Sequence, residues 1–370
     1  MRVLMSGGGT GGHVNPAIAI ANEIAKREPD SEIAFVGTQR GIENRLVPKE
    51  GYQLFHVEIQ GIRRSLSPKN LKTLRLAAQA MRKCKKIVRD FKPDVVIGTG
   101  GYACWPVVRA AQKLGIPTFL HESNATPGFA VKMLQKEARR IYVNFEETIP
   151  QLAEPEKALR VGNPMRGGFK EIDRESAREK LGIAGKYRTF LLSLGGSMGA
   201  ERVNEEVLAV MRDYTSKHPE IMHVHATGAI EYEIAKKQFE DMGLDKYPNL
   251  SLVEYVYDMP IKMAAADVVI NRAGAMTLSE LALLGRAAIL IPSPNVTNNH
   301  QYKNAAVLEN AGAAVLLEEK DLTEGVLTSA VSELCEDRAK RADMEEKITK
   351  FAVRDASERI YEDIIKSMRH

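Results

Sequence analysis

Glycine clusters that follow apolar runs are the parts of this sequence best suited to bind an anion. The first, SGGGTGGH at Ser6–His13, comes directly after the apolar run Arg2–Ser6. Glycine lets backbone N–H groups approach an anion, and the start of the helix expected next adds partial positive charge. The cluster lacks the lysine of a nucleoside triphosphatase loop and fits the dinucleotide pattern G-x-G-x-x-G only loosely. It therefore predicts a phosphate site, with a tight strand–helix turn as the alternative.

Two further glycine clusters repeat this arrangement. GTGGY at Gly98–Tyr102 and GGSMGA at Gly195–Ala200 each follow an apolar run. Either could be a plain turn, and Ser197 could cap the helix that follows it. If GTGGY lies beside the first cluster in one sheet, the pair predicts a diphosphate held between two helix starts. The third cluster predicts a second ligand that carries phosphate.

A fourth segment, GAMTLSE at Gly274–Glu280, allows two interpretations. Thr277 and Glu280 have the spacing of a capping box, in which both side chains only satisfy a helix start. Alternatively, the Glu280 carboxylate accepts hydrogen bonds from two adjacent hydroxyls, as a ribose diol would offer.

The elements around these clusters alternate between short apolar runs and longer helical patterns, which is typical of βαβ units and buried parallel sheets. The expected strands are 2–6, 32–37, 94–98, 117–121 and 140–144, followed by 188–194, 221–227, 249–254, 267–270, 287–292 and 313–317. Residues 321–370 are expected to be helical, and the irregular, charged segment 145–187 is the predicted linker. The sequence thus predicts two α/β domains whose binding loops face a shared cleft, which suits an enzyme that joins two substrates.

Length and composition set outer limits on function. The chain has 370 residues, enough for two domains, and a net charge of only +4, which argues against a dedicated nucleic-acid binder. Three widely spaced cysteines exclude a disulfide framework and favour a reducing compartment. The N-terminus lacks the apolar core of a signal peptide, and no uncharged apolar run reaches the ~20 residues of a membrane helix. We expect a cytoplasmic protein, which could still lie on a membrane surface.

The charge is unevenly distributed. Segment 60–92 holds eleven Lys and Arg residues and one Asp, a net charge of +10. Its apolar residues recur near helical spacing, as in an amphipathic helix that lies on anionic lipid. The alternative is an ordinary packed helix with a solvated basic face.

Together these motifs resemble one family, the MurG-type N-acetylglucosaminyltransferases of peptidoglycan synthesis. The matching segments are GGGTGGH at 7–13, GTGGY at 98–102, HESN at 121–124, GNPMR at 162–166, GGSMGA at 195–200, RAGAMTLSE at 272–280 and NHQYKNA at 299–305. The combination of GGTGGH, GNPxR and GAxTxxE is specific, whereas related glycolipid synthases share the first loop.

The resemblance implies a GT-B fold: two Rossmann-like, doubly wound parallel-sheet domains that face a deep cleft. Residues 1–165 would form the acceptor and membrane-associating domain, with the C-terminal helix 354–370 packed back on it. Residues 166–353 would bind UDP-N-acetylglucosamine, the donor. The implied acceptor is lipid I, undecaprenyl-diphosphate-N-acetylmuramoyl-pentapeptide, at the cytoplasmic face of the cell membrane. Transfer to the muramoyl 4-hydroxyl with inversion would give lipid II.

The resemblance also assigns partners and site residues. It implies a peripheral membrane protein that needs no cofactor. The implied partners are an anionic membrane surface, which residues 60–92 would contact, and further cell-wall synthesis proteins. Nucleic acid is not an implied partner. The implied donor contacts are Thr10, Gly11, Gly12, Asn124, Arg166, Ser197, Val256, Gly274, Ala275, Met276, Thr277, Glu280, His300 and Gln301. The implied contacts to the acceptor diphosphate are Gly8, Gly9, Gly100, Gly101 and Tyr102.

Within this set, individual roles follow from the family. Arg166 and Ser197 would hold the nucleotide and its diphosphate, and the backbone of Val256 would face uracil. Glu280 would bind the ribose hydroxyls, and Gln301 the sugar hydroxyls.

This sequence departs from the family pattern in two places. Ser123 stands where many relatives have Gln, and His300 stands where others have the first residue of a Gln pair. The loop before Gln301 also differs in length.

An inverting transfer needs a base for the acceptor hydroxyl and charge stabilisation for the leaving UDP. His13 is the candidate base, because imidazole titrates near neutral pH. Phosphate binding or loop structure is the alternative role for His13, and Glu122 and His121 are rivals for the proton. No Asp-x-Asp motif occurs, so no metal site is expected. The helix start near Ala200 could stabilise UDP instead.

Three other functions remain open from the sequence alone. A UDP-sugar 2-epimerase has two such domains and would need no lipid acceptor. A glycolipid synthase would use the same donor with diacylglycerol. A nucleotide-binding regulator would release no UDP with any acceptor.

Overall fold

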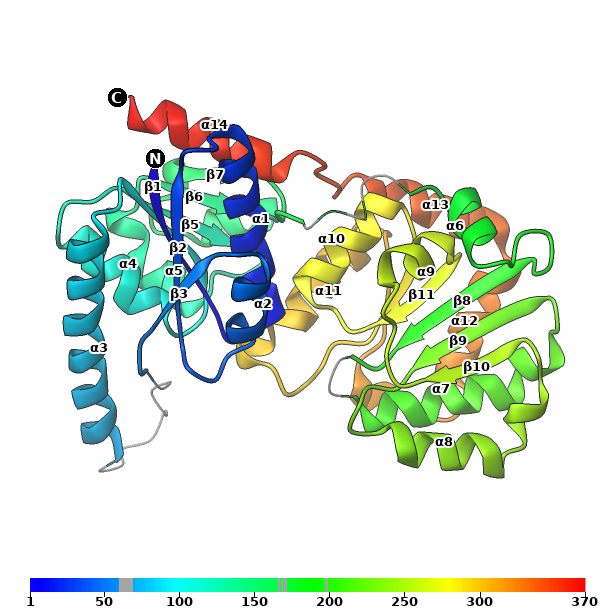
Figure 1. Ribbon diagram of the computed structural model, residues 1–370. Helices are drawn as coiled ribbons and strands as arrows, with labels where there is room; N and C mark the ends of the chain where they lie inside the picture. The colour runs from blue at the N-terminus through cyan, green and yellow to red at the C-terminus, as the bar shows by residue number, and fades with distance from the viewer. Residues whose placement is uncertain (60–68, 166, 168, 170–171, 197–198, 370) are drawn as a thin grey trace. The chain divides into compact units, whose positions relative to one another are not determined.

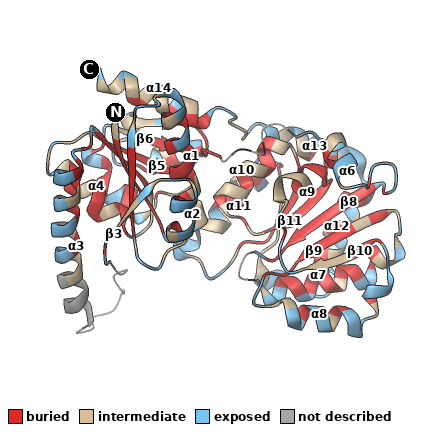
Figure 2. Ribbon diagram, in the orientation of Figure 1, coloured by how far each residue is buried: buried red, intermediate tan, exposed pale blue. Residues whose placement is uncertain are grey.

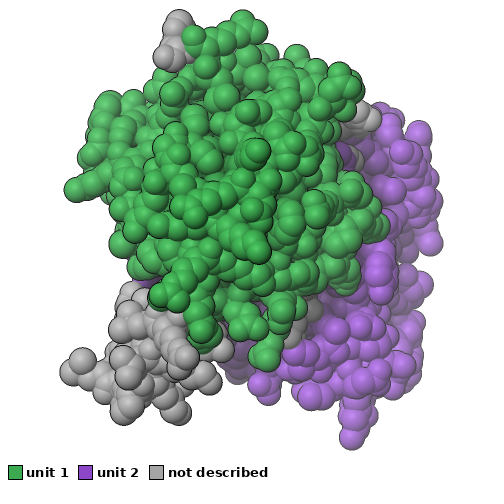
Figure 3. All heavy atoms as spheres, turned by 60° about the vertical axis from the view of Figure 1, so that its left-hand side comes forward, with its two compact units in different colours: residues 1–166, 353–370 green, residues 167–352 purple. Residues whose placement is uncertain are grey.

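A computed structural model of the protein describes residues 1–59, 69–165, 167, 169, 172–196 and 199–369. The chain forms two compact units, which Figure 3 distinguishes by colour. Unit 1 contains residues 1–166 and 353–370, and unit 2 contains residues 167–352.

Unit 1 is built on a seven-stranded parallel sheet (Figure 1). Its strands are β1 (Arg2–Gly7), β2 (Glu32–Gly37), β3 (Gln53–His56), β4 (Val95–Gly100), β5 (Thr118–Glu122), β6 (Arg140–Val143) and β7 (Ala158–Arg160). Their order across the sheet is β3-β2-β1-β4-β5-β6-β7. The inner strands are near-continuous apolar runs, because helices cover both faces of such a sheet.

Two helical layers cover this sheet, and Figure 2 shows the buried strands. On one face, α1 (Gly11–Arg27), α2 (Glu43–Lys49) and α14 (Ala356–Met368) contribute to one apolar core. On the other, α3 (Lys69–Phe91), α4 (Cys104–Gln112) and α5 (Phe129–Leu134) contribute to a second. The C-terminal helix is also held by polar contacts, since the Tyr142 hydroxyl donates to Asp363 at 2.9 Å.

Unit 2 repeats the design with six parallel strands in the order β10-β9-β8-β11-β12-β13. The strands are β8 (Thr189–Leu194), β9 (Ile221–Ala226), β10 (Leu250–Val253), β11 (Val268–Asn271), β12 (Ala287–Leu290) and β13 (Val315–Leu316). The helices are α6 (Arg174–Lys180), α7 (Glu201–Asp213), α8 (Tyr232–Asp241), α9 (Met259–Ala265), α10 (Ala275–Leu284), α11 (His300–Asn310), α12 (Val326–Glu336) and α13 (Arg338–Thr349).

Each sheet has one topological switch point, where the strand order reverses. It lies between β1 and β4 in unit 1 and between β8 and β11 in unit 2. Ligands of doubly wound sheets bind beyond the carboxyl ends of the strands at such points. The glycine clusters predicted from the sequence follow these four strands, so the topology places two clusters at each switch point.

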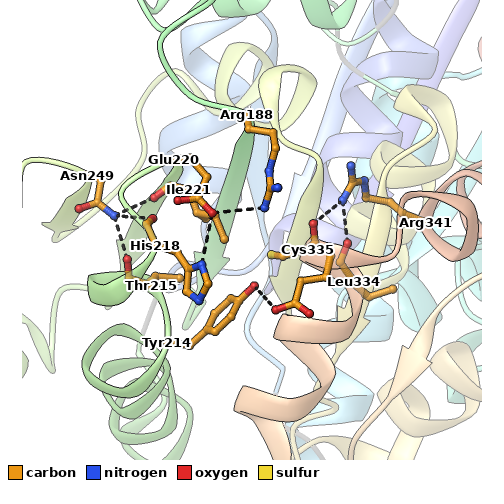
Figure 4. Close-up of polar contacts among 11 residues, drawn as sticks. Arg188, Tyr214, Thr215, His218, Glu220, Ile221, Asn249, Leu334, Cys335 and Arg341 are labelled. Carbon is orange, nitrogen blue, oxygen red and sulfur yellow. Dashed lines mark hydrogen bonds and ion pairs between the residues drawn. The ribbon is translucent and has the colours of Figure 1, made fainter.

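Polar side chains brace unit 2 near the amino ends of its strands (Figure 4). The buried Asn249 amide donates to the carbonyl oxygens of Thr215 at 2.9 Å and Ile221 at 2.8 Å. The Tyr214 hydroxyl donates to Glu336 at 3.2 Å. These contacts hold the strand ends opposite the ligand loops.

Two sequence expectations need correction, and a third is confirmed. Strands β3 and β7 were not anticipated, because both are partly exposed edge strands without a continuous apolar run. The segment 145–187 contains the boundary between the two units, but it is not irregular throughout, since it includes β7 and α6. The expected all-helical segment 321–370 is confirmed by α12, α13 and α14. In the part of the chain that the structure describes, no helix is long and apolar enough to span a membrane.

Candidate functional site

The loop after β1 uses its first glycines internally. The Gly8 N–H donates to the Gly100 carbonyl oxygen at 3.3 Å, and the Gly9 N–H donates to the Glu43 carboxylate at 2.8 Å. Helix α1 then starts at Gly11. Because the first N–H groups of a helix have no partner inside it, Gly11 and Gly12 supply the donors an anion can use.

The second loop packs directly on the first. Gly100 and Gly101 have φ angles of +110° and +87°, which favour glycine. A Cβ atom on Gly101 would lie 2.2 Å from the Gly8 carbonyl oxygen, and one on Gly100 would lie 2.4 Å from Nδ1 of His13. Both positions therefore require glycine. Tyr102, the next residue, is 62% exposed.

His13 lies half-buried where these loops meet. Its Nδ1 atom lies 3.0 Å from the Thr99 carbonyl oxygen. Since a carbonyl oxygen only accepts hydrogen bonds, this contact requires the hydrogen on Nδ1. In the neutral imidazole the lone pair is then on Nε2, which is the arrangement that a general base needs.

The two rivals of His13 are enclosed. His121 is buried, its Nε2 lies 3.1 Å from the Gly162 carbonyl oxygen, and burial lowers its pKa to about 4. Glu122 is also buried, which raises its pKa, although the N–H groups of Gly128 and Asn124 stabilise its charged form at 2.6 Å and 3.0 Å. Glu122 is thus bound to the loop after β5 and His121 to the Gly162 carbonyl oxygen, whereas His13 is only half-buried.

Asn124 belongs to this same loop. Its side-chain amide donates to the Glu122 carboxylate at 3.0 Å, and its backbone carbonyl oxygen accepts from the Thr148 hydroxyl at 2.9 Å. Unit 1 therefore brings the loops after β1, β4 and β5 to one edge of the sheet.

In unit 2, the segment Gly274–Glu280 forms the start of α10, and no side chain caps this helix. The N-cap of α10 is Gly274. Thr277 is the third helical residue, so the capping-box interpretation is wrong. The start of α10, where the helix dipole is positive, is instead suited to meet an anion.

Glu280 lies on α10 with its side chain partly buried. Burial raises the pKa of this carboxyl to about 8. Among the residues that the structure describes, it forms no hydrogen bond or ion pair. A desolvated carboxyl without another partner can accept from a ligand's hydroxyl groups once it is ionised.

Two predicted donor contacts, Arg166 and Ser197, lie outside the described residues. Around Ser197, Gly195 donates to the Ala226 carbonyl oxygen at 2.8 Å. The N-cap of α7 is Ala200, and the suggestion that Ser197 caps this helix falls on a residue outside the described ones.

The remaining donor residues follow β10 and β12. Val256 is buried, whereas its neighbours along the chain, Tyr255 and Tyr257, are exposed. The rings of these two tyrosines meet edge to face with centroids 5.1 Å apart. His300 starts α11, and its Nδ1 lies 2.9 Å from the Thr297 carbonyl oxygen. The Gln301 side-chain oxygen accepts from the Ser293 N–H at 2.8 Å, which orients its amide.

Sequence reasoning missed two residues that shape these loops. Glu43 was not singled out, because an isolated acid carries no motif. Arg272 donates to the carbonyl oxygens of Ile291 at 3.1 Å and Pro292 at 3.2 Å, and so ties the loops after β11 and β12 together. The sequence did contain a signal for Arg272, because this residue begins the family motif RAGAMTLSE.

The described side chains include no cluster of three or more His, Cys, Asp or Glu residues that could hold a metal ion. The expectation that no cofactor is needed stays a prediction.

Two doubly wound parallel sheets with anion-binding loops at their switch points are the architecture of GT-B glycosyltransferases. The chain belongs to glycosyltransferase family 28, whose N-terminal domain matches residues 3–143 and whose C-terminal domain matches residues 190–360.

Individual relatives agree with this membership. A protein of Acetivibrio thermocellus named UDP-N-acetylglucosamine–N-acetylmuramyl-(pentapeptide) pyrophosphoryl-undecaprenol N-acetylglucosamine transferase is 43% identical over 100% of this chain and 99% of its own. The crystal structure of Acinetobacter baumannii MurG is 28% identical, covers 99% of each chain and has a TM-score of 0.79. A UDP-GlcNAc 2-epimerase from Neisseria meningitidis, 14% identical with a TM-score of 0.69 over 99% of this chain and 100% of its own, shares the fold.

Proposed function

We propose that this protein transfers N-acetylglucosamine from UDP-N-acetylglucosamine to the muramoyl 4-hydroxyl of lipid I, with inversion, to form lipid II. The name of the relative that is 43% identical over the full chain supports this substrate pair. The structural observation that carries the proposal is His13, whose Nδ1 faces the Thr99 carbonyl and whose Nε2 can accept a proton at the junction of two anion-binding loops.

Unit 1 supplies the acceptor contacts. The first turn of α1 and the loop Gly100–Tyr102 bind the acceptor diphosphate, with N–H groups and the helix dipole opposing its charge. Gly8 and Gly9 shape this loop, because their N–H groups are already bonded within the protein.

Most of the donor contacts are assigned to unit 2, and Asn124 and Arg166 of unit 1 add to them. The first turns of α7 and α10, with Arg166 and Ser197, bind the UDP diphosphate. Glu280 accepts from the ribose hydroxyls, the backbone at Val256 faces uracil, and the amides of Gln301 and Asn124 bind the sugar. His300 completes the donor contacts. Thr10, Gly11 and Gly12, which the resemblance also places at the donor, are here assigned to the acceptor diphosphate, because they form the start of α1.

The reaction is a single displacement. The Nε2 atom of His13 takes the proton as the acceptor 4-oxygen forms a bond to the sugar C1. The bond from C1 to the UDP oxygen breaks on the opposite face, and its electron pair leaves with UDP. Helix N-termini and the Arg166 guanidinium stabilise the negative charge that develops there.

The acceptor's location requires contact with a lipid surface. Helix α3 supports such a contact, because Arg82, Lys83 and Lys86 are exposed while Cys84 and Val88 are buried. A docked apolar face and a free basic face suit an anionic membrane. The protein would then be peripheral at the cytoplasmic membrane face, beside other cell-wall synthesis proteins.

UDP release distinguishes the alternatives. We expect release from UDP-N-acetylglucosamine with a short-chain lipid I analogue and none with diacylglycerol. Release with diacylglycerol alone would instead identify a glycolipid synthase. Conversion of the donor to a new sugar without acceptor would identify a 2-epimerase.

A further inference from the structure

Glu43 is a buried carboxylate that joins two loops at the acceptor side of unit 1. Its side chain is fully enclosed. One oxygen accepts from the Gly9 N–H at 2.8 Å, and the other accepts from the N–H and the hydroxyl of Thr38 at 2.8 Å and 2.9 Å. The loop after β1 is thereby fixed to the loop after β2.

The chain is shaped to receive this side chain. A Cβ atom on Gly8 would lie 2.7 Å from one Glu43 oxygen, and one on Gly37 would lie 2.6 Å from its Cγ. Glu43 is also the first residue of α2, whose N-terminal dipole stabilises a negative charge. Three donors and a helix start offset the desolvation of the carboxylate, so the charge can be buried.

This contact determines how the glycine loop enters α1. Gly9 has a φ of +88°, and its N–H points to Glu43. Thr10 is then extended as the N-cap, and α1 begins at Gly11. The N–H groups that face an anion, and the start of the helix that carries His13, therefore depend on where Glu43 holds Gly9.

We propose that Glu43 is a positioning residue of the acceptor site, which fixes the glycine loop so that the first turn of α1 meets the acceptor diphosphate. The inference rests on the proposed function, since it assumes that a diphosphate binds there. Glu43 itself touches neither substrate.

The substitution Glu43→Gln tests this role with little change in volume. Gln offers one acceptor oxygen to three donors, and its NH2 group must face at least one N–H or O–H group. We expect kcat/KM for a short-chain lipid I analogue to fall by about tenfold or more, because small displacements of binding groups are costly. The Kd for UDP, measured by calorimetry, should change less than about twofold, because none of the residues assigned to UDP lies in the loop that Glu43 holds.

A matched control is Glu23→Gln on helix α1, the helix whose start Glu43 is proposed to position. Glu23 is similarly buried and pairs with Nε of Arg27 at 2.8 Å, in the part of α1 remote from the glycine loop. Both kinetic and binding values should stay at the wild-type level in this variant.

A second variant, Gly9→Ala, tests the same loop in case the Glu43→Gln variant does not fold. A Cβ atom there would meet nothing within 4 Å, so only the left-handed φ opposes alanine. We expect the same loss specific to the acceptor. Unchanged acceptor kinetics in both variants, or an equal loss of UDP affinity, would overturn the role of Glu43. A wild-type protein that transfers no sugar to the analogue would instead overturn the proposed function.

Discussion

His13 and Thr99 form a reciprocal pair of contacts between α1 and β4. Nδ1 of His13 lies 3.0 Å from the Thr99 carbonyl oxygen, and the Thr99 hydroxyl donates to the His13 carbonyl oxygen at 2.6 Å. The ring orientation is thus set by a central strand rather than by the loop itself. A base held in this way keeps its Nε2 in one direction before substrate arrives.

Replacing His13 by Ala should remove the base while leaving the donor site intact. We expect kcat to fall about 10²- to 10⁴-fold, the usual contribution of a general base. Affinity for UDP-N-acetylglucosamine, measured by calorimetry, should stay near the wild-type value. If affinity falls as much as turnover, His13 is a phosphate contact and another residue is the base.

Donor affinity should depend on pH through Glu280, whose carboxyl has a pKa of about 8 before ligand binds. Ribose hydroxyls donate best to the ionised carboxylate, so binding should release a proton and tighten as pH rises toward 8. Below that pKa, the Kd for UDP-N-acetylglucosamine should fall by up to about tenfold for each unit by which the pH rises. Isothermal titration between pH 6.5 and 8.5 measures this slope.

The variant Glu280→Gln is the control for this slope. Its affinity should be nearly independent of pH in the same range, and it should discriminate poorly between the donor and its 2′-deoxy analogue. A slope that survives the substitution would show that another group titrates.

The sequence predicts the inner strands well, because their apolar runs and the glycine clusters after them are strong local signals. The edge strands β3 and β7 escaped prediction, since a strand with one open edge needs no continuous apolar run. The capping box failed because Thr277 and Glu280 have the right spacing, but Gly274 takes the cap position. Local pattern does not fix where a helix starts.

For the candidate site as well, some features could be predicted from local sequence patterns and others could not. Types and order of residues at Gly7–His13 and Gly274–Glu280 were enough to suggest anion and diol chemistry. The contact of Glu43 with Gly9 joins positions 34 residues apart, and no local pattern reports it. Likewise, only the fold shows that Glu122 is committed to the N–H groups of its own loop.

Acid should destabilise the protein through its buried histidines. Burial lowers the pKa of His121 and His225 to about 4, and that of His223 well below its ordinary value. Below pH 6.5 the unfolded chain binds protons that the folded chain does not, so the free energy of unfolding falls toward pH 4. Each group contributes up to ~1.4 kcal/mol per pH unit. Glu280, whose pKa is raised, acts in the opposite direction between about pH 8 and 4.5.

A variant separates these opposing contributions. His225 contacts Ser193 at 2.9 Å and Asn204 at 3.1 Å, and Gln at this position can hydrogen-bond to both without titrating. Urea unfolding between pH 6.5 and 5.5 should show a slope shallower by roughly 1 kcal/mol per pH unit in His225→Gln than in wild type. Equal slopes in the two proteins would mean that His225 is not protonated on unfolding.

The exposed basic face of α3 gives the last prediction. Arg82, Lys83 and Lys86 are exposed and Lys85 is partly so. Each basic residue near an anionic surface contributes about 1 kcal/mol, screened over a Debye length. Reversing all four to Glu should abolish sedimentation with vesicles that contain phosphatidylglycerol. Wild-type binding should itself weaken steeply between low and physiological salt.

A control with the same change in charge tests whether the position matters. Lys217, Lys236, Lys237 and Lys246 are exposed residues of unit 2. Their reversal to Glu should leave most vesicle binding intact, because they are not on α3. Turnover of a water-soluble acceptor analogue should stay near wild type in both variants, since none of the eight residues is assigned to a substrate. If vesicle binding survives reversal on α3 or is lost equally in the control, α3 is an ordinary packed helix with a solvated side.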